Sequence, residues 1–115
     1  MTTPCWQASH LLIKHSGSRN PVSRRTGMPT TLSYDEAAAE LQQWRQSIED
    51  GKMTFEDAAR QRSDCGSYVR GGDLGVFGPG EMMKPFEDAT KGLKVGQMSG
   101  LVATDSGVHL IKRIA

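Results

Sequence analysis

Three side chains that could carry out catalysis stand far apart in this sequence: His10 near the start, Cys65 in the middle and His109 near the end. An imidazole beside a thiol makes thiolate available, and thiolate is the nucleophile of cysteine hydrolases. Two histidines on different strands meet only if those strands are neighbours, which sequence spacing does not show. No signature of a known cysteine nucleophile surrounds Cys65. A Cys–His catalytic group and three unrelated structural residues both remain open.

Zinc binding by Cys65, His10, His15 and His109 is a further alternative. The two cysteines, Cys5 and Cys65, are 60 residues apart and have no metal-like spacing. We therefore predict neither a metal nor a cofactor. For the same reason we expect no disulfide framework, and a reducing compartment is the default for such a protein.

An apolar, glycine-rich stretch follows Cys65 directly. Glycines let the backbone turn sharply and let another chain approach closely. The apolar side chains interspersed with them are Leu74, Val76, Phe77, Met82, Met83 and Phe86. This combination favours a small apolar pocket beside a polar reactive group, as a peptide-handling site would need. From these residues alone, an ordinary hydrophobic core is an equally good interpretation.

A basic segment spans residues 14–31. Residues 1–34 contain Lys14, Arg19, Arg24 and Arg25 without any acid, a charge of +4, whereas residues 35–115 carry −3. The segment also contains Gly, Pro, Ser and Asn, which predicts a mobile loop. An ammonium and a guanidinium can together hold a phosphate, so one interpretation of this segment is that it binds an anionic ligand. We expect no nucleic-acid partner, because no aromatic residues are interleaved. A solvated loop without a ligand remains the alternative.

The elements that must position these residues can be predicted from local patterns. Residues 6–13 fit a buried strand. Ser33 and Glu36 form a capping box before a helix whose apolar face includes Trp44 and which ends at Gly51. A second helix is predicted from about Thr54 to Arg62 and a third from Pro85. Residues 63–81 look irregular, apart from a short strand at 74–77.

The C-terminal residues predict a hairpin. Strands are expected at 100–103 and 108–114, joined by a turn at Thr104-Asp105-Ser106-Gly107. In the last strand, Val108 and Leu110 should face one way and His109 and Ile111 the other. The order of elements predicts an α+β fold with a small, mostly antiparallel four-stranded sheet surrounded by about four helices.

Length and composition fit one domain. The chain has 115 residues, of which 37% are hydrophobic and 23% charged. No apolar run is long enough for a membrane span. We expect no signal peptide, because residues 1–10 lack its charged and hydrophobic regions. We expect a monomeric cytoplasmic protein with no membrane partner. The Arg24-Arg25 pair is too short to serve as a nuclear signal, which leaves a nuclear location open.

Six ordered blocks resemble the parvulin family of peptidyl-prolyl cis-trans isomerases, specifically its Pin-type group. They are ASHLLIKHSGSR, FEDAAR, SDCGS, RGGDLGVFGPGEM, KPFEDA and TDSGVHLIKR. The resemblance begins at Ala8, so residues 1–7 are expected to form a short tail and residues 8–115 the isomerase domain, without the WW module of many Pin-type proteins. It implies a parvulin/FKBP-like fold.

The resemblance also assigns roles to residues. It implies that Leu74, Met82 and Phe86 grip the proline ring of the substrate. It implies further that His10 and His109 lie side by side under the site, surrounded by Cys65, Ser106 and Thr104. A non-covalent role for Cys65 is favoured, because rotation about a bond needs no covalent intermediate.

The basic loop gains a specific role from the resemblance. In Pin-type parvulins it binds the phosphate of a phospho-Ser or phospho-Thr before proline, and Lys14 and Arg19 match two of the binding residues. Asn20 stands where the family has a second arginine, and Arg24 or Arg25 could compensate. Gly66 and Met83 are further departures, at positions where polar residues are common. The implied partners are client proteins with phosphorylated Ser/Thr-Pro motifs.

Two alternatives keep the fold but change the function. A phosphopeptide-binding adaptor would have little turnover, and the presence of His10, Cys65, Ser106 and His109 argues against it. A phosphate-indifferent parvulin would act as a general folding helper, and Asn20 keeps that possibility open.

Overall fold

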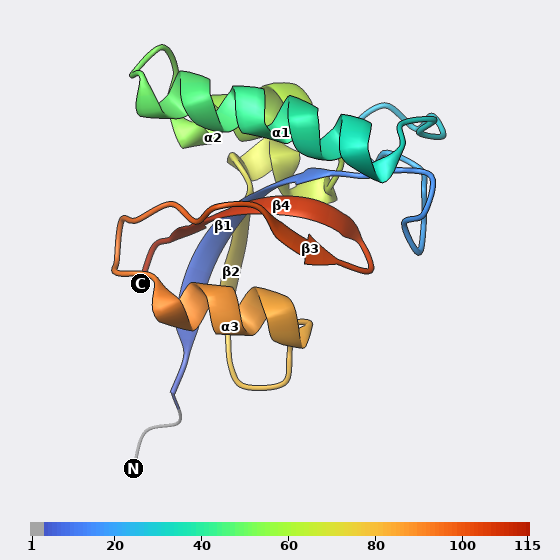
Figure 1. Cartoon of the computed structure of the whole chain (residues 1–115). Coiled ribbons are helices and arrows are strands. Elements are labelled where there is room, and N and C mark those ends of the chain that lie inside the picture. The colour runs from blue at the N-terminus through green and yellow to red at the C-terminus, as the bar shows by residue number, and fades with distance from the viewer. Residues whose placement is uncertain (1–3) are drawn as a thin grey trace.

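The computed structural model describes residues 4–115, in which helices cover both faces of one antiparallel sheet. The elements in chain order are β1 (Trp6–Ile13), α1 (Tyr34–Glu49), α2 (Phe55–Arg62), the 3-10 helix η1 (Gly66–Arg70), β2 (Asp73–Phe77), α3 (Lys84–Gly92), β3 (Val102–Thr104) and β4 (Gly107–Arg113). Figure 1 shows α1 and α2 on one side of the sheet and α3 on the other. The predicted α+β class and four-stranded sheet are confirmed.

The sheet brings the two ends of the chain together. Its strand order is β2-β1-β4-β3, so the first and last strands are central neighbours. In their antiparallel register, His10 lies opposite Ile111 and Leu12 lies opposite His109. The two histidines are therefore diagonal neighbours on one face, close enough for their side chains to meet.

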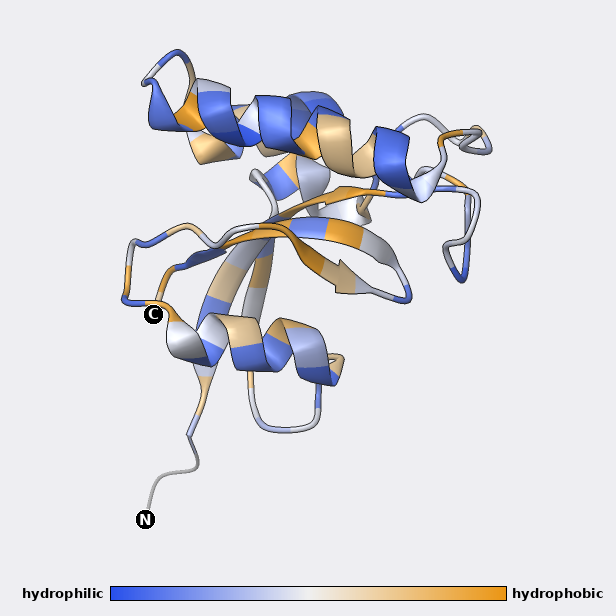
Figure 2. Ribbon diagram, in the orientation of Figure 1, coloured by the Kyte–Doolittle hydropathy of each residue, from blue (hydrophilic) through white to orange (hydrophobic). Residues whose placement is uncertain are grey.

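Alternation along the central strands separates two hydrophobic cores. Leu11 and Ile13 of β1, with Val108 and Leu110 of β4, pack against α1 and α2. On the opposite face, Ala8 and Ile111 pack against the α3 side of the sheet. Figure 2 shows hydrophobic residues along these strands and mainly hydrophilic residues on the outer side of α1. The predicted facing of β4 is confirmed, and it leaves His10 and His109 on the α3 side.

Local signals specify the helix starts. The Ser33 hydroxyl accepts from the Glu36 backbone N–H at 3.1 Å, and the Glu36 carboxylate accepts from the Ser33 N–H at 2.9 Å, so the predicted capping box is formed. Trp44 is partly buried against the core, as expected.

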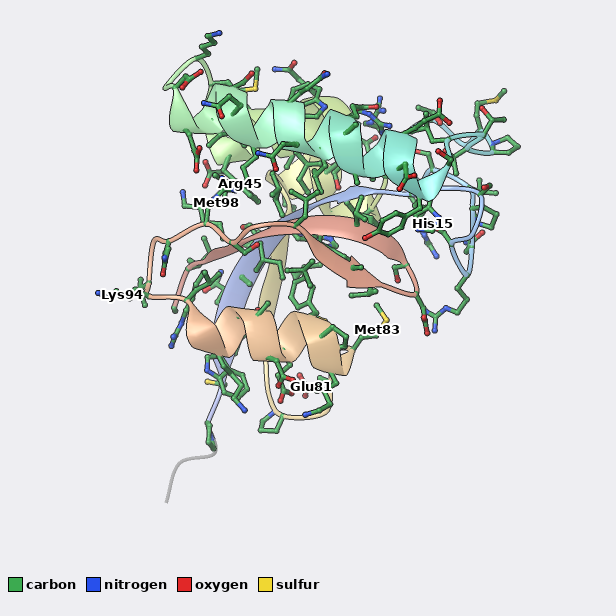
Figure 3. All side chains as sticks on the ribbon, in the orientation of Figure 1. His15, Arg45, Glu81, Met83, Lys94 and Met98 are labelled. Carbon is green, nitrogen blue, oxygen red and sulfur yellow. The ribbon has the colours of Figure 1, made fainter. Side chains whose placement is uncertain are left out.

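The C-terminal half of α1 is tied to the segment before β3. The Arg45 Nε donates to the Ser99 carbonyl at 3.1 Å, and Figure 3 shows Arg45 reaching toward the segment that holds Met98.

Two local features differ from the prediction. The 3-10 helix η1 occupies part of the stretch predicted to be irregular, and no apolar periodicity announces so short an element. The third strand begins at Val102 rather than at Gly100 and ends at Thr104, so the turn narrows to Asp105-Ser106. No helix within residues 4–115 has both the length and the apolar composition that crossing a membrane requires.

Candidate active site

The two buried histidines form a hydrogen-bonded pair at the centre of the sheet. Their Nδ1 atoms are 2.9 Å apart, and the rings stack with centroids 5.1 Å apart. The Nε2 atom of His109 lies 2.6 Å from the Thr104 hydroxyl, which also accepts from the Ser106 backbone N–H at 3.1 Å. Because Thr104 and Ser106 belong to the β3–β4 hairpin, the turn itself fixes the orientation of the pair.

The histidine pair is held neutral. Burial lowers the pKa of His10 to about 4. Burial, and then the neighbouring His10, lowers the pKa of His109 to about 3. A proton on both Nδ1 atoms would turn two N–H donors toward each other across the 2.9 Å contact. The pair therefore acts as a neutral polar group within an apolar surrounding.

An apolar wall stands directly beside the pair. The Phe86 ring meets His10 edge-on at 5.6 Å and His109 at 5.4 Å between centroids, and only 2% of Phe86 is exposed. Pro85 in the first turn of α3 suits this helix start and places Phe86 over the sheet. Leu74 from β2 and Met82 from the preceding loop pack beside it. These three residues are the predicted proline-binding group.

Cys65 enters the same cavity from the other side. Its backbone N–H donates to the Ser63 hydroxyl at 3.4 Å, and it immediately precedes η1. Within the described residues 4–115, its sulfur forms no hydrogen bond with either imidazole or with any other group. A thiol activated by an imidazole needs such a contact, so this geometry does not support the cysteine hydrolase alternative.

The basic loop closes the cavity at the end away from α3. Lys14 is buried and its ammonium donates to the Val22 carbonyl at 2.8 Å. Burial, followed by the Arg24 cation, lowers the pKa of Lys14, while Asp64 opposes that shift. The Arg19 backbone N–H donates to the Asp105 carbonyl at 2.7 Å. The segment forms a loop after β1, and the Arg19 contact ties it to the turn between β3 and β4.

Asp64 is a positioning residue that sequence reasoning missed. Only 3% exposed, it accepts the Lys14 backbone N–H at 2.9 Å and pairs with Arg62 at 3.0 Å, while Arg62 also binds Glu40. Its own carbonyl accepts the Arg24 backbone N–H at 2.9 Å. Asp64 thereby joins the end of β1, the basic loop and the cysteine segment. The only sequence signal for a role of Asp64 was its position directly before Cys65 in the SDCGS block.

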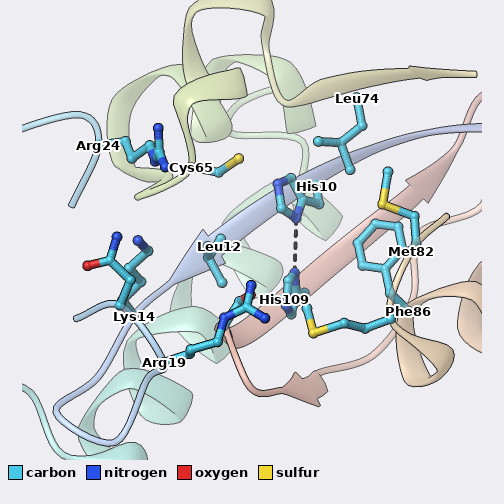
Figure 4. Close-up of a pocket in the computed structure, with 13 residues that line it drawn as sticks. His10, Leu12, Lys14, Arg19, Arg24, Cys65, Leu74, Met82, Phe86 and His109 are labelled. Carbon is cyan, nitrogen blue, oxygen red and sulfur yellow. Dashed lines mark hydrogen bonds between the residues drawn. The ribbon is translucent and has the colours of Figure 1, made fainter. Parts of the chain in front are cut away.

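The histidine pair, the apolar wall, Cys65 and the basic loop surround one cavity of about 280 Å³. Figure 4 shows the side chains that line it. The predicted residues that line it are His10, Lys14, Arg19, Cys65, Leu74, Met82, Phe86, Ser106 and His109, and they are joined by Leu12, Asn20, Arg24 and Met83. Of the predicted site residues, only Thr104 does not line the cavity. Its hydroxyl instead contacts the His109 ring from outside the cavity.

The remaining candidates lie elsewhere. Arg25 lines a different cavity, with Glu40 and Arg62. His15 packs against the Tyr34 ring at 5.3 Å. Across residues 4–115, no three metal-ligating side chains gather as an ion would require.

Comparison with known proteins decides the family. The family model described as "Rotamase: PPIC-type PPIASE domain" matches residues 10–115, which include every residue of the site above. The chain belongs to the parvulin family of peptidyl-prolyl cis-trans isomerases. It is therefore an enzyme that accelerates rotation about peptide bonds preceding proline.

Individual parvulins resemble the chain over nearly its whole length. It is 51% identical over 112 residues to "Peptidyl-prolyl cis-trans isomerase Pin1" of Arabidopsis thaliana, covering 95% of this chain and 94% of that protein. It is 50% identical over 107 residues to "Peptidyl-prolyl cis-trans isomerase ESS1" of Saccharomyces cerevisiae, covering 91% and 62%. The solution structure of TbPIN1 superposes with a TM-score of 0.90 at 60% identity, covering 99% and 100%. The predicted family is confirmed.

Replacing Cys65 by Ala is expected to lower kcat/KM of this parvulin about tenfold, equivalent to an interaction of about 1.4 kcal/mol with the rotating imide. The side chain is only partly buried and makes no hydrogen bond within residues 4–115, so the fold should persist. NMR exchange on a proline peptide measures the rate, and circular dichroism checks the fold. Full activity in Cys65→Ala would show that the thiol is dispensable.

Proposed function

We propose that this isomerase acts on client proteins at bonds between a phosphorylated Ser or Thr and proline. The supporting observation is that one cavity has an apolar end, at Leu74, Met82 and Phe86, and a cationic end, at Lys14 and Arg19. A phospho-Ser-Pro pair presents an apolar ring and a dianion at adjacent residues. The two ends of the cavity match those two groups.

The chemistry needed is the stabilisation of a twisted bond. Rotating an amide costs about 18–20 kcal/mol, and Xaa-Pro bonds exchange over roughly tens to hundreds of seconds. In our proposal, the apolar wall fixes the ring while the preceding carbonyl turns. The enzyme then lowers the barrier by binding the twisted imide better than either planar isomer.

The polar groups have different tasks in this proposal. His10 and His109 form a neutral scaffold, which Thr104 orients through its 2.6 Å contact with His109. Cys65 and Ser106 face the cavity as polarisable and polar neighbours of the substrate carbonyl. No bond breaks, so none of them needs to act as a nucleophile.

Lys14 and Arg19 bind the phosphate in this proposal. One donor of the Lys14 ammonium is used by the Val22 carbonyl, which leaves two for a ligand. A dianion beside Lys14 also opposes the effect of burial and of Arg24 on its pKa. The site is therefore more favourable with an anion in it than without one.

The test compares phospho-Ser-Pro, Glu-Pro and Ala-Pro peptides by NMR exchange. We expect Lys14→Met with Arg19→Ala to lower the ratio of kcat/KM for phospho-Ser-Pro over Ala-Pro about 100-fold, from two charge-assisted hydrogen bonds of about 1.5 kcal/mol each. Methionine keeps the buried stem of residue 14. The matched control, Lys52→Ala with Arg60→Ala, removes two positive charges at exposed positions outside the cavity.

Other outcomes identify the other functions. Equal acceleration of all three peptides by the unmodified protein would indicate a general folding helper and refute phosphate direction. Resonance shifts without acceleration would indicate an adaptor. An equal fall in the ratio for the control pair would mean that overall charge, and not this site, attracts the phosphopeptide.

A further inference from the structure

Among residues 4–115, three cations and no carboxylate line the active-site cavity: Lys14, Arg19 and Arg24. We infer that Arg24 is a third phosphate-binding group, whose guanidinium approaches from the Cys65 side of the cavity, opposite Arg19. This inference rests on the proposed function. It goes beyond the Lys14 and Arg19 positions that the family resemblance supplies, because it assigns the role to a residue outside that pattern.

Backbone contacts place the two arginines on either side of Lys14. The Arg24 N–H donates at 2.9 Å to the carbonyl of Asp64, the residue before Cys65. The Arg19 N–H donates at 2.7 Å to the carbonyl of Asp105, the residue before Ser106. Figure 4 shows Arg24 beside Cys65, Arg19 toward His109, and Lys14 between them. An anion at Lys14 would thus meet a guanidinium from each side.

The turn at residues 22–29 directs the adjacent residues Arg24 and Arg25 to different cavities. Val22 and Pro29 form an isolated antiparallel bridge, and the Ser23 N–H donates to the Met28 carbonyl at 3.0 Å, so residues 22–29 fold back on themselves. Within this turn, Arg24 lines the active-site cavity whereas Arg25 lines the separate cavity beside Glu40 and Arg62. The structure therefore favours Arg24 over Arg25 as the residue that compensates for Asn20.

The charge of Arg24 is not neutralised internally. Among residues 4–115, its guanidinium forms no ion pair or hydrogen bond with a carboxylate, although it is near enough to lower the pKa of Lys14. Lys14 and Arg24 repel each other, and Asp64 offsets this effect on the Lys14 pKa only in part. A bound dianion would attract both cations. The guanidinium fork is also the side-chain shape that binds phosphate through two parallel hydrogen bonds.

The Arg24 stem lies beside Gly66, the residue after Cys65. A Cβ at residue 66 would lie 3.7 Å from the Arg24 Cδ, so the stem of Arg24 lies over this glycine. By the family resemblance noted above, polar residues are common at this position in other chains. At 3.7 Å such a Cβ would make an ordinary van der Waals contact, so this distance places the Arg24 stem beside the Cys65 segment without requiring a glycine.

Replacing Arg24 by Ala should lower the ratio of kcat/KM for phospho-Ser-Pro over Ala-Pro about tenfold, equivalent to about 1.4 kcal/mol. Arg24 is exposed, so its loss should not unfold the protein. Arg25→Ala is the matched control, since it removes the same charge from the next residue, outside this cavity, and should leave the ratio unchanged. An unchanged ratio in Arg24→Ala, or an equal fall in both variants, would overturn the inference.

A second arginine at residue 20 gives an independent test. If Arg24 supplies a guanidinium that Asn20 lacks, Asn20→Arg should raise the ratio more in the Arg24→Ala background than in the unmodified protein. Equal gains in both backgrounds would mean that the two positions act separately and that Arg24 does not bind the same phosphate. If the unmodified protein itself does not distinguish phospho-Ser-Pro from Ala-Pro, the proposed function fails. An unmodified protein that does distinguish them, with no effect of Arg24→Ala, refutes only the inference.

Discussion

Acidification from about pH 7.5 to about pH 5 is expected to lower the free energy of unfolding by about 4 kcal/mol through His10 and His109 alone. In the unfolded chain each imidazole has a pKa of about 6.5. In the folded protein, the pKa values are about 4 for His10 and about 3 for His109. Between these values, the unfolded state binds protons that the folded state cannot accept. The contribution of His10 and His109 to stability is therefore fully present above about pH 6.5. It decreases as the pH falls toward about 4.

Urea denaturation at a series of pH values measures this loss. The matched comparison is His10→Leu with His109→Leu, which replaces the pair by apolar side chains, while the carboxylates that also titrate in acid are kept. The dependence on pH should be flatter in the double variant by about 1.4 kcal/mol per histidine for each pH unit below 6.5. An independent measurement follows the imidazole NMR signals of the unmodified protein. Titration of either buried ring near pH 6.5 would contradict the prediction.

The histidine pair also shows what the sequence could and could not predict. Alternation in β4 placed His109 and Ile111 on one face correctly, because strand periodicity is a local property. That His10 joins them depends on the antiparallel register, with Leu12 opposite His109, which links residues almost a whole chain apart. No spacing rule contains that register. The adjacency was expected only through the family resemblance.

In the rest of the site, too, features set by neighbouring residues could be predicted from the sequence, and features set by contacts between distant residues could not. The capping box at Ser33 and the proline in the first turn of α3 are local signals; α1 starts directly after Ser33, and α3 starts at Lys84, one residue before the predicted Pro85. Asp64 was missed because its contacts run to Lys14 and Arg24, whose backbone atoms come near it only in the folded chain. The choice between Arg24 and Arg25 was open for the same reason, since it depends on the turn at residues 22–29.

Replacing Gly72 by Ala is expected to destabilise the protein by about 4 kcal/mol or more, among the largest effects of any single substitution. A Cβ on residue 72 would lie 2.2 Å from the carbonyl oxygen of His10 and 3.2 Å from the Cβ of Ala59. Both are fixed, because the Gly72 carbonyl accepts the His10 N–H at 2.9 Å and Ala59 is fully buried in α2. Either β1 moves at His10 or the hydrogen bond between the His10 N–H and the Gly72 carbonyl breaks.

Gly75→Ala is the control that separates contact from backbone strain. Both glycines have positive φ, +89° at Gly72 and +76° at Gly75, but a Cβ at residue 75 would meet nothing within 4 Å. Strain alone costs about 1–2 kcal/mol, so the difference between the variants in urea denaturation measures the clash. Equal free energies of unfolding for Gly72→Ala and Gly75→Ala would show that the backbone beside His10 moves to accept the Cβ at no energetic cost. If it does not yield, displacement of His10 should also widen its 2.9 Å contact with His109, so Gly72→Ala should lose more activity than Gly75→Ala even where both remain folded. Gly72 would then be the residue through which the segment between η1 and β2 fixes the geometry of the histidine pair.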